Sequence, residues 1–275
     1  MDQTLTIPAT LRLAAFTLDV EHDYGSRTGR FEALRDAAGV ERLQSFLGRR
    51  GIPVSAFAVS SLLDQEPAAV EFLRALRAEV HSHSHTHGGE ETEKELMESQ
   101  DIIRRLFPQG PIGYRAPHGR VDAEQVQIAK RLGYAFSSSV FPSLRPGVFN
   151  NLASPLTPYR HANGLVELPF AVVRGVRLIV SVSYIKLFGW GLFERLMGRF
   201  GLPPVAVIDS HLHDFLDTPS YRLLPAPLRL AWGVNRMRGI EFAGRLADFL
   251  ARRGYTFVTM NEIVRRLQPP GEGGS

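Results

Sequence analysis

Apolar residues follow two different periods along this chain. Short runs such as 11–18 and 205–208 are apolar at nearly every position and stop at charged residues, which is typical of strands buried on both faces. Other segments repeat at helical spacing: Val40, Leu43 and Phe46 share one face before Gly51 ends the pattern. Strands are expected over 11–18, 53–59, 79–82, 113–116, 134–140, 167–170, 177–183, 205–208 and 255–259. Helices are expected over 39–50, 67–77, 122–132 and 239–253, with another after a capping box at 92–95.

The alternation of these elements predicts the fold class. Strands that alternate with helices pair in parallel through right-handed crossovers, and about seven such units favour a barrel over an open sheet. We therefore expect an α/β fold, a distorted (β/α)7-type barrel, in a single domain over residues 1–268. The chain has 275 residues, 44% of them hydrophobic, which suffices for one large core. The tail 269–275 is rich in Pro and Gly and is expected to be disordered.

Composition excludes several classes of protein. The chain has no cysteine, which excludes disulfides, thiolate catalysis and Cys-ligated zinc. Its net charge is only +4 and no run of five like charges marks a nucleic-acid arm, so no nucleic-acid partner is expected. Neither a signal peptide nor a run of 18 uncharged apolar residues is present in the sequence, which favours a cytoplasmic protein.

Ionisable residues gather where the predicted strands end. Asp19, the histidine run 81–87, Arg115 and His211 each follow a different predicted strand. In barrels, the carboxyl ends of the strands carry the active site. Four such positions together predict one site built from separate segments.

The histidine run is the most informative part of this site. Residues 81–87 read His-Ser-His-Ser-His-Thr-His, with an imidazole at every second position. In an extended segment all four point to one side, whereas in a tight turn His83 and His87 share a face. Imidazole is the commonest side-chain ligand for divalent transition metals, so either arrangement favours a metal site over a solvated polar loop.

Three further segments carry charged or imidazole groups. Asp19 and Glu21 point the same way if extended, and could supply one metal ligand and one base; a solvated acidic turn is the alternative. Arg115 could hold a carboxylate through two hydrogen bonds, or lie on the surface beside a turn. His211 and His213 would share one face, and either could act as an acid or be an ordinary buried histidine.

Together these segments resemble the polysaccharide deacetylase family, the carbohydrate esterases with a NodB homology domain. His83-Ser84-His85-Thr86-His87 matches the family's His-Ser/Thr-x-x-His motif, and 115–119 matches its Arg-x-Pro-x-Gly motif. The segment 205–211 resembles the late strand that ends in a catalytic histidine. The resemblance implies that His83 and His87 are metal ligands, while His81 and His85 are neighbours without that role.

Three departures from the family pattern qualify the resemblance. The first motif has a spaced acidic pair, which by analogy with a subgroup makes Asp19 the base and Glu21 the ligand, with Asp23 as fallback ligand. Serines stand at 137–139 where the family often has an aspartate, so Asp209 or Asp214 would have to orient the catalytic histidine. The register after the late strand favours His211 over His213 as that histidine.

The resemblance implies a metal-dependent amide hydrolase. The expected substrate is an N-acylated amino sugar, acetyl or formyl, in a glycan or in a lipid-linked or nucleotide-linked carbohydrate. The ligand types favour zinc, and cobalt, nickel or iron also suit two imidazoles and a carboxylate. Arg115 would orient Asp19, and His211 would protonate the leaving amine. Substrate contacts are predicted for Tyr114, Pro117, Ser138 and His213.

Two other functions and one further surface stay open. The chain could hydrolyse a non-sugar amide such as a cyclic ureide, or be a non-catalytic carbohydrate-binding relative. The stretches 176–204 and 221–238 are apolar with interleaved basic residues, including Lys186, Arg195 and Arg199. They read as ordinary barrel helices or as a surface that contacts a membrane or a lipid-linked glycan.

Overall fold

The fold is built on one sheet whose central strands all run in the same direction. The computed structural model describes residues 3–88 and 92–267, so the predicted disordered tail 269–275 lies outside the described residues. Seven neighbouring strands pair in parallel. In sheet order they are β13 (Val205–Ile208), β2 (Leu13–Val20), β3 (Val54–Ala58), β4 (Glu79–Ser82), β5 (Gly113–Tyr114), β6 (Phe136–Ser137) and β10 (Val166–Glu167). The predicted parallel α/β fold is confirmed.

The two edges of this sheet curve toward each other. After β10 the chain continues to Phe170, which forms an isolated parallel bridge with Val207 of β13, and the Ala171 N–H donates to the Val207 carbonyl at 2.8 Å. The ring is therefore completed by a bridge instead of a continuous ladder. β14 (Thr256–Phe257) pairs in parallel with the first residues of β2, and β1 (Gln3–Thr4) and β9 (Tyr159–Arg160) extend the β10 edge antiparallel.

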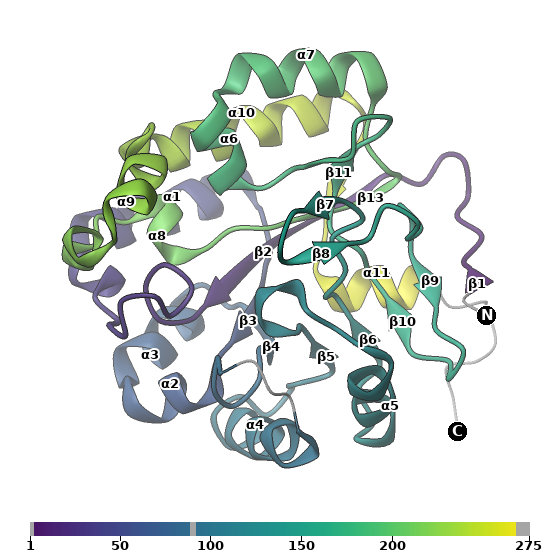
Figure 1. Cartoon of the computed structure of the whole chain (residues 1–275), viewed down its shortest axis with the longest axis horizontal. Helices are drawn as coiled ribbons and strands as arrows, with labels where there is room; N and C mark the ends of the chain where they lie inside the picture. The colour runs from purple at the N-terminus through teal and green to yellow at the C-terminus, as the bar shows by residue number, and fades with distance from the viewer. Residues whose placement is uncertain (1–2, 89–91, 268–275) are drawn as a thin grey trace.

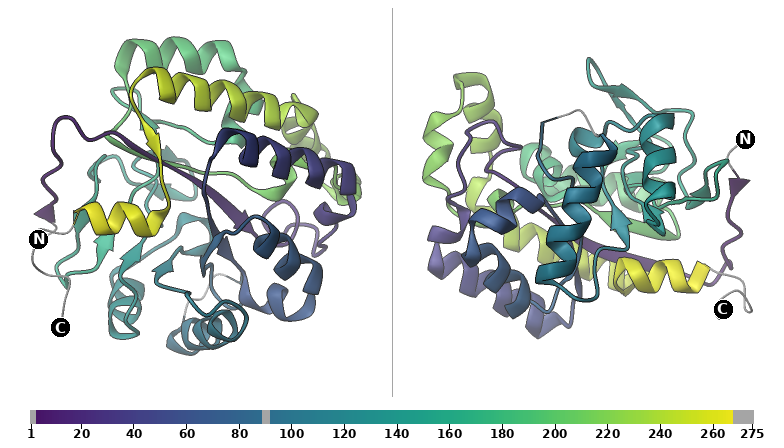
Figure 2. Two further views of the ribbon diagram at one scale, coloured as in Figure 1. Left: turned by 180° about the vertical axis from the view of Figure 1, so that it is seen from behind. Right: turned by 90° about the horizontal axis from the view of Figure 1, so that it is seen from below.

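Helices cover the outside of the sheet, as the views from behind and below show (Figure 1, Figure 2). They are α1 (Ala37–Arg50), α2 (Ser60–Gln65), α3 (Pro67–Ala75), α4 (Glu93–Leu106), α5 (Ala123–Arg131), α6 (Val182–Phe188), α7 (Trp190–Phe200), α8 (Leu212–Phe215), α9 (Ala226–Gly233), α10 (Gly239–Arg252) and α11 (Met260–Leu267). None of the described helices is both long enough and apolar enough to cross a membrane.

Alternation along β2 explains how the sheet points polar groups to one place. All eight residues of β2 are buried, as predicted for a strand covered on both faces. Leu13 and Ala15 pack inside the ring, whereas Phe16, Leu18 and Val20 pack in the cluster with α1. Asp19 has the same parity as Leu13 and Ala15, so its carboxylate points into the ring at the carboxyl end of the strand.

Two sequence expectations differ from the structure. The segment 177–183 is not one strand: β12 (Leu178–Ile179) forms an antiparallel hairpin with β11 (Val172–Val173), and Ser181 then caps α6. At α4, Thr92 accepts the Glu95 N–H at 3.3 Å as expected. The Glu95 carboxylate does not return to the cap; it accepts from Thr86 N at 2.8 Å and from the Ser84 and Thr86 hydroxyls. Only the Thr92 half of the predicted capping box is therefore present, because Ser84 and Thr86 offer the Glu95 carboxylate three donors.

β7 (Leu144–Arg145) and β8 (Phe149–Asn150) form a separate hairpin.

Candidate active site

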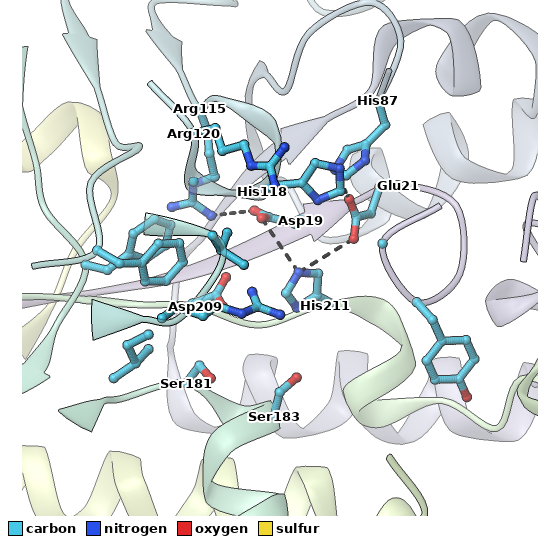
Figure 3. A pocket seen from close by; sticks show the side chains of 18 of the residues that line it. Asp19, Glu21, His87, Arg115, His118, Arg120, Ser181, Ser183, Asp209 and His211 are labelled. Carbon is cyan, nitrogen blue, oxygen red and sulfur yellow. Dashed lines mark hydrogen bonds and ion pairs between the residues drawn. The ribbon is translucent and has the colours of Figure 1, made fainter. Parts of the chain in front are cut away.

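The strand ends surround one cavity of about 500 Å³, a volume usual for ligand pockets. It contains the ionisable side chains predicted from four separate segments (Figure 3). These are Asp19 and Glu21 at the end of β2, His83 and His87 after β4, Arg115 after β5, and His211 after β13. Parallel bridges bring the segments together, since Asp19 pairs with His211 and Ser82 pairs with Tyr114.

Glu21, His83 and His87 form a group whose ligand atoms all lie within 4.8 Å of one another. The Glu21 Oε2 atom lies 3.6 Å from His83 Nε2 and 2.5 Å from His87 Nε2. The side chains of all three residues are 3% exposed. Burial of a carboxylate between two imidazoles is costly unless a shared cation, either a proton or a metal, holds them together.

This group fits a divalent transition metal. A tetrahedral ion with ligand bonds of about 2.0–2.1 Å keeps its ligand atoms about 3.3 Å apart, close to the spacing of His83 Nε2 and Glu21 Oε2. The His83 Nδ1–H donates to the Arg115 carbonyl at 2.9 Å, which leaves Nε2 free as a ligand atom. The 2.5 Å between His87 Nε2 and Glu21 Oε2 is the length of a hydrogen bond, so a proton must lie between these two atoms. A bound metal ion would take the place of that proton.

Electrostatics also favour an ionised Glu21. Burial alone would raise the pKa of Glu21, but the charge on His87 and hydrogen bonds from His83 and His87 hold that pKa well below its usual range. Burial likewise lowers the pKa of His83, and the carboxylates of Asp19 and Glu21 outweigh it and raise that pKa. The carboxylates around His83 therefore stabilise positive charge at this position, as a cation site requires.

Asp19 lies beside this group and belongs to a different interaction. Its Oδ1 atom accepts a short charged hydrogen bond from Arg115 Nη1. Its Oδ2 atom lies 3.8 Å from His83 Nε2 and 3.9 Å from His211 Nε2. One carboxylate oxygen is thus fixed by Arg115, while the other lies between two imidazoles with room for a small polar group.

Arg115 is held rigidly, which is unusual for a side chain of its length. It is 1% exposed, and its guanidinium lies 3.8 Å from the ring centre of Phe57 and 4.4 Å from that of Phe170. Its Nε–H donates to the Ser138 carbonyl at 3.1 Å, and Nη1 donates to Thr17 Oγ1 at 3.1 Å. Packing between two rings together with these hydrogen bonds fixes the orientation of Asp19.

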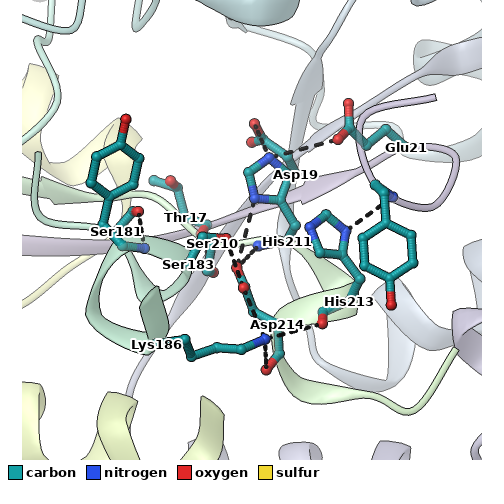
Figure 4. A network of polar contacts seen from close by, with 12 residues as sticks. Thr17, Asp19, Glu21, Ser181, Ser183, Lys186, Ser210, His211, His213 and Asp214 are labelled. Atoms are coloured by element: carbon teal, nitrogen blue, oxygen red, sulfur yellow. Dashed lines mark hydrogen bonds and ion pairs between the residues drawn. The ribbon is translucent and has the colours of Figure 1, made fainter. Parts of the chain in front are cut away.

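His211 is supported from below by a buried ion pair (Figure 4). Asp214 Oδ2 accepts the His211 backbone N–H at 3.0 Å and lies 3.7 Å from His211 Nδ1. The Lys186 ammonium, also buried, lies 3.4 Å from Asp214 Oδ1. Asp209 completes the surroundings, since its carboxylate groups with Asp19 and His211. Both acids suggested for orienting this histidine are therefore close to it.

His211 and His213 differ in their protonation. Burial lowers the pKa of His211, but the carboxylates of Asp209 and Asp214 outweigh it and raise that pKa well above the usual value. Burial and the charge of His211 lower the pKa of His213 to about 3. The His213 Nδ1 atom accepts the Tyr24 N–H at 3.3 Å. At neutral pH His211 is therefore the imidazolium of the two, which is the protonation state that an acid requires.

We expect Asp214→Asn to destabilise the fold strongly, because the substitution leaves the buried Lys186 ammonium without its counterion. Breaking a buried pair in this way costs about 3–5 kcal/mol. Burial raises the pKa of Asp214, but the charge of Lys186 and a hydrogen bond with His211 outweigh it and lower that pKa. The stabilisation therefore exists above the unfolded pKa of about 3.9 and is lost as pH falls below it. Urea unfolding of both proteins should give a constant gap between pH 5 and 8.

The matched control is Asp217→Asn, which removes a half-exposed carboxylate 2.6 Å from Arg236. A surface pair of this kind contributes about 0–1 kcal/mol. Equal destabilisation by the two substitutions would contradict the role given to the buried pair.

Two histidines of the run 81–87 lie outside the cavity lining. His81 packs against Phe57 and Phe136 with Glu79 at 3.4 Å, and His85 contacts Ser60 and Glu98. The four imidazoles therefore do not share one side, because the strand ends at Ser82 and the chain turns through Ser84, where φ is +69°. Of the four, only His83 and His87 line the cavity, and these are the two for which the resemblance implies a ligand role.

The predicted substrate contacts divide in the same way. His213 lines the cavity, whereas Tyr114, Pro117 and Ser138 are buried and are not among its described lining residues. Tyr114 packs on Tyr134, 5.8 Å between ring centres, and Ser138 accepts from Arg115 Nη2. Direct substrate contact is thus corrected to a supporting position for these three. Asp23, the fallback ligand, binds Ser220 Oγ and the Glu32 N–H, and is absent from the metal-type group.

The cavity also has lining residues that sequence reasoning missed. His118 has a left-handed backbone with φ of +59°, and its ring contacts the His87 ring edge-on with 4.4 Å between ring centres. Burial and the charge of His87 lower the pKa of His118 to about 4. Tyr24 lies 4.6 Å from His213 and 5.6 Å from Trp232 between ring centres. Only the loop motif around His118 offered a signal; the aromatic contacts join residues some 200 positions apart.

Residues 23–137 match the family model described as polysaccharide deacetylase. This segment of the chain carries the polysaccharide deacetylase domain of that family. The family predicted from the sequence motifs is thereby confirmed. The matched segment includes His83, His87 and Arg115, whereas the roles of Asp19, Glu21 and His211 outside it depend on the geometry described above.

Solved structures with the deacetylase fold are similar to this chain at low sequence identity. A candidate polysaccharide deacetylase from Mycobacterium smegmatis is 20% identical, with a TM-score of 0.60 over 96% of this chain and 93% of that one. An allantoinase is 17% identical, with a TM-score of 0.59 over 94% and 91%. A CE4 family pseudoenzyme from Bacillus anthracis is 13% identical, with a TM-score of 0.54 over 92% and 66%. These show the fold alone, so function has to be argued from the site. No curated protein matches the chain.

Proposed function

We propose that this deacetylase-family chain is a metal-dependent hydrolase that removes an N-acyl group from an amino sugar. The observation that carries the proposal is the arrangement of three units around one cavity. They are the metal-type group of Glu21, His83 and His87, the Asp19–Arg115 pair, and the protonated His211. Amide hydrolysis needs a cation to polarise the carbonyl, a base for water and an acid for the leaving amine.

The chain's own residues can divide these steps. Asp19 Oδ2 accepts a proton from the attacking water, while Arg115 keeps the other oxygen in place. His211 donates a proton to the leaving nitrogen as the carbon–nitrogen bond breaks, and its raised pKa keeps that proton available at neutral pH. Asp19 Oδ2 and His211 Nε2 lie 3.9 Å apart, so the base and the acid face the same part of the cavity.

Glu21, His83 and His87 would hold the metal. A bound divalent ion supplies Lewis-acid polarisation of the acyl carbonyl and makes water more acidic. Two imidazoles and one carboxylate suit zinc, and also cobalt, nickel or iron. His83 is the most firmly oriented of the three, through its hydrogen bond to the Arg115 carbonyl.

The cavity walls support a sugar as substrate. One aromatic group in the lining is formed by Tyr24, His213 and Trp232. A second contains the stacked rings of Phe141 and Phe170, whose centres are 3.7 Å apart. Flat aromatic faces flanking polar groups suit a ring that has both apolar C–H faces and hydroxyls.

The cavity rim supports a phosphate-bearing form of that substrate. Arg27, Arg120 and Arg145 line the rim and are exposed, and none of them forms an ion pair within residues 3–88 and 92–267. Guanidinium groups suit phosphate oxygens because they donate two hydrogen bonds in a fixed geometry. We therefore favour the lipid-linked or nucleotide-linked amino sugars among the proposed substrates.

A metal analysis combined with an activity screen tests the proposal. The purified chain should contain about one divalent ion and release acetate or formate from an N-acylated amino sugar, with loss of turnover after chelation and recovery when zinc is added. Turnover of a cyclic ureide alone would instead assign the alternative hydrolase activity. Stoichiometric metal with no turnover of either class would indicate a non-catalytic binding relative.

A further inference from the structure

The apolar residues of α9 are not packed into the core. None of the residues of this helix is buried, and Leu230 is 75% exposed. In Figure 1 the helix lies at the periphery of the molecule beside α6 and α8. An apolar side chain held so far from the core is typical of a surface that contacts another phase or partner.

Exposed apolar residues from neighbouring segments extend this surface. Tyr221 donates to the Arg229 carbonyl at 2.5 Å, which places the segment before α9 against it, and Asn235 donates to the Lys186 carbonyl at 2.9 Å, which joins the end of α6. We define the α9 face as Leu187, Phe188, Leu223, Leu230, Val234 and Met237 with Arg222 and Arg229. Its apolar members range from 38% to 75% exposed.

The charge of the α9 face is one-sided. Residues 218–240 contain four arginines and no acidic residue. Arg236 and Arg238 pair with Asp217 and Glu241, whereas Arg222 and Arg229 form no ion pair within the described part of the chain. Unpaired arginines among exposed leucines are complementary to a surface that is negatively charged outside and apolar beneath.

The α9 face is also continuous with the candidate active site. Trp232, two residues after Leu230, lies about 200° around the helix from it, and its ring lines the cavity 6.1 Å from the His213 ring. One side of the same short helix therefore contacts the cavity while the other side is exposed. A substrate held in a surface that covers α9 would reach the cavity from its rim.

We propose that the α9 face docks on an anionic lipid bilayer, which presents a lipid-linked amino sugar to the cavity. The part of this inference that concerns substrate depends on the proposed function, but docking itself does not require turnover. Lys186, which the sequence grouped with the basic residues of this region, does not contribute, because it is buried against Asp214. The arginines that contribute are Arg222 and Arg229.

Vesicle sedimentation with the full chain tests the docking. We expect it to sediment with vesicles of phosphatidylcholine containing phosphatidylglycerol, and at least about tenfold more weakly with phosphatidylcholine alone. The double variant Leu223→Glu/Leu230→Glu should lose at least tenfold in binding. Arg222→Ala/Arg229→Ala should weaken binding to anionic vesicles and reduce its dependence on salt. The control is Met97→Glu, an equally simple change at a residue of α4 that is 49% exposed, and it should bind like the unaltered chain.

Each outcome decides for or against docking. An unaltered chain that stays in the supernatant with anionic vesicles, or a double glutamate variant that sediments equally well, overturns it. If light scattering instead shows a dimer that this variant dissociates, without vesicle binding, the face is occupied by a second copy. Normal turnover of soluble sugars without vesicle binding would defeat the docking alone, whereas vesicle binding without turnover of any acylated sugar would defeat only the proposed function.

Discussion

Asp19→Asn should lower kcat/KM by about 10²–10⁴-fold while the protein keeps its metal. An amide oxygen can still accept a hydrogen bond from Arg115, but it cannot take a proton from water at neutral pH, and general-base catalysis typically contributes an effect of this size. Metal retention is expected because the group of Glu21, His83 and His87 excludes Asp19. Metal per chain by elemental analysis and single-substrate kinetics give the two readouts.

The matched control for this prediction is Asp23→Asn. Asp23 is buried like Asp19 and lies on the same segment, but it binds Ser220 and the Glu32 N–H instead of lining the cavity. The control should keep both metal and activity, provided that thermal melts show both variants folded at the assay temperature. Normal turnover by Asp19→Asn would exclude Asp19 as the base, and loss of metal in Asp23→Asn would restore Asp23 as a ligand.

Periodicity predicted the parts of the fold that depend on local patterns. β4 and β13 have their predicted bounds, and β2 and β3 lie within two residues of theirs. In β2, β3 and β13 a strand buried on both faces leaves an apolar run that is easy to recognise. The hairpin of β11 and β12 was missed because its two-residue strands and the first turn of α6 together read as one extended segment. Ser181, which caps α6 by accepting the Tyr184 N–H at 3.2 Å, was the available signal.

The candidate site was predictable where a residue follows its strand directly. Asp19, Arg115 and His211 could be placed at strand ends, and parallel pairing then brings strand ends together. Lys186 could not be identified, since a single lysine in an apolar helix resembles a side chain that extends to solvent. Its burial is decided by Asp214, 28 residues later, and by the carbonyls of His213 and Asp214, which also accept from its ammonium.

The serines at 137–139, which stand where the resemblance suggests an aspartate, contact Arg115 and its neighbour Ala116. Ser139 Oγ accepts the Ala116 N–H at 2.8 Å, and the Ser138 carbonyl and hydroxyl both accept from Arg115. The segment therefore supports Arg115 rather than His211. His211 is instead surrounded by Asp209 and Asp214 of its own segment, and Asp214 is paired with Lys186 of α6.

His83→Ala should abolish both metal binding and activity. The substitution removes one of three ligand side chains and the hydrogen bond that its Nδ1–H donates to the Arg115 carbonyl. Loss of an outer partner of a metal ligand alone typically costs 10–100-fold in affinity, so loss of the ligand itself should cost more than about 100-fold. Elemental analysis after dialysis, followed by kinetics at rising zinc concentration, measures the two effects separately.

The histidine run supplies its own control for this prediction. His85→Ala changes the same residue type two positions away, but His85 contacts Ser60 and Glu98 outside the metal-type group. It should therefore keep stoichiometric metal and most of the activity. If both variants lost metal equally, the run would act as a loose polyhistidine segment; if His83→Ala kept metal and turnover, the metal centre would have to lie elsewhere. Selective loss in His83→Ala is the result expected of a site in which alternate histidines point to different places, as the left-handed turn at Ser84 requires.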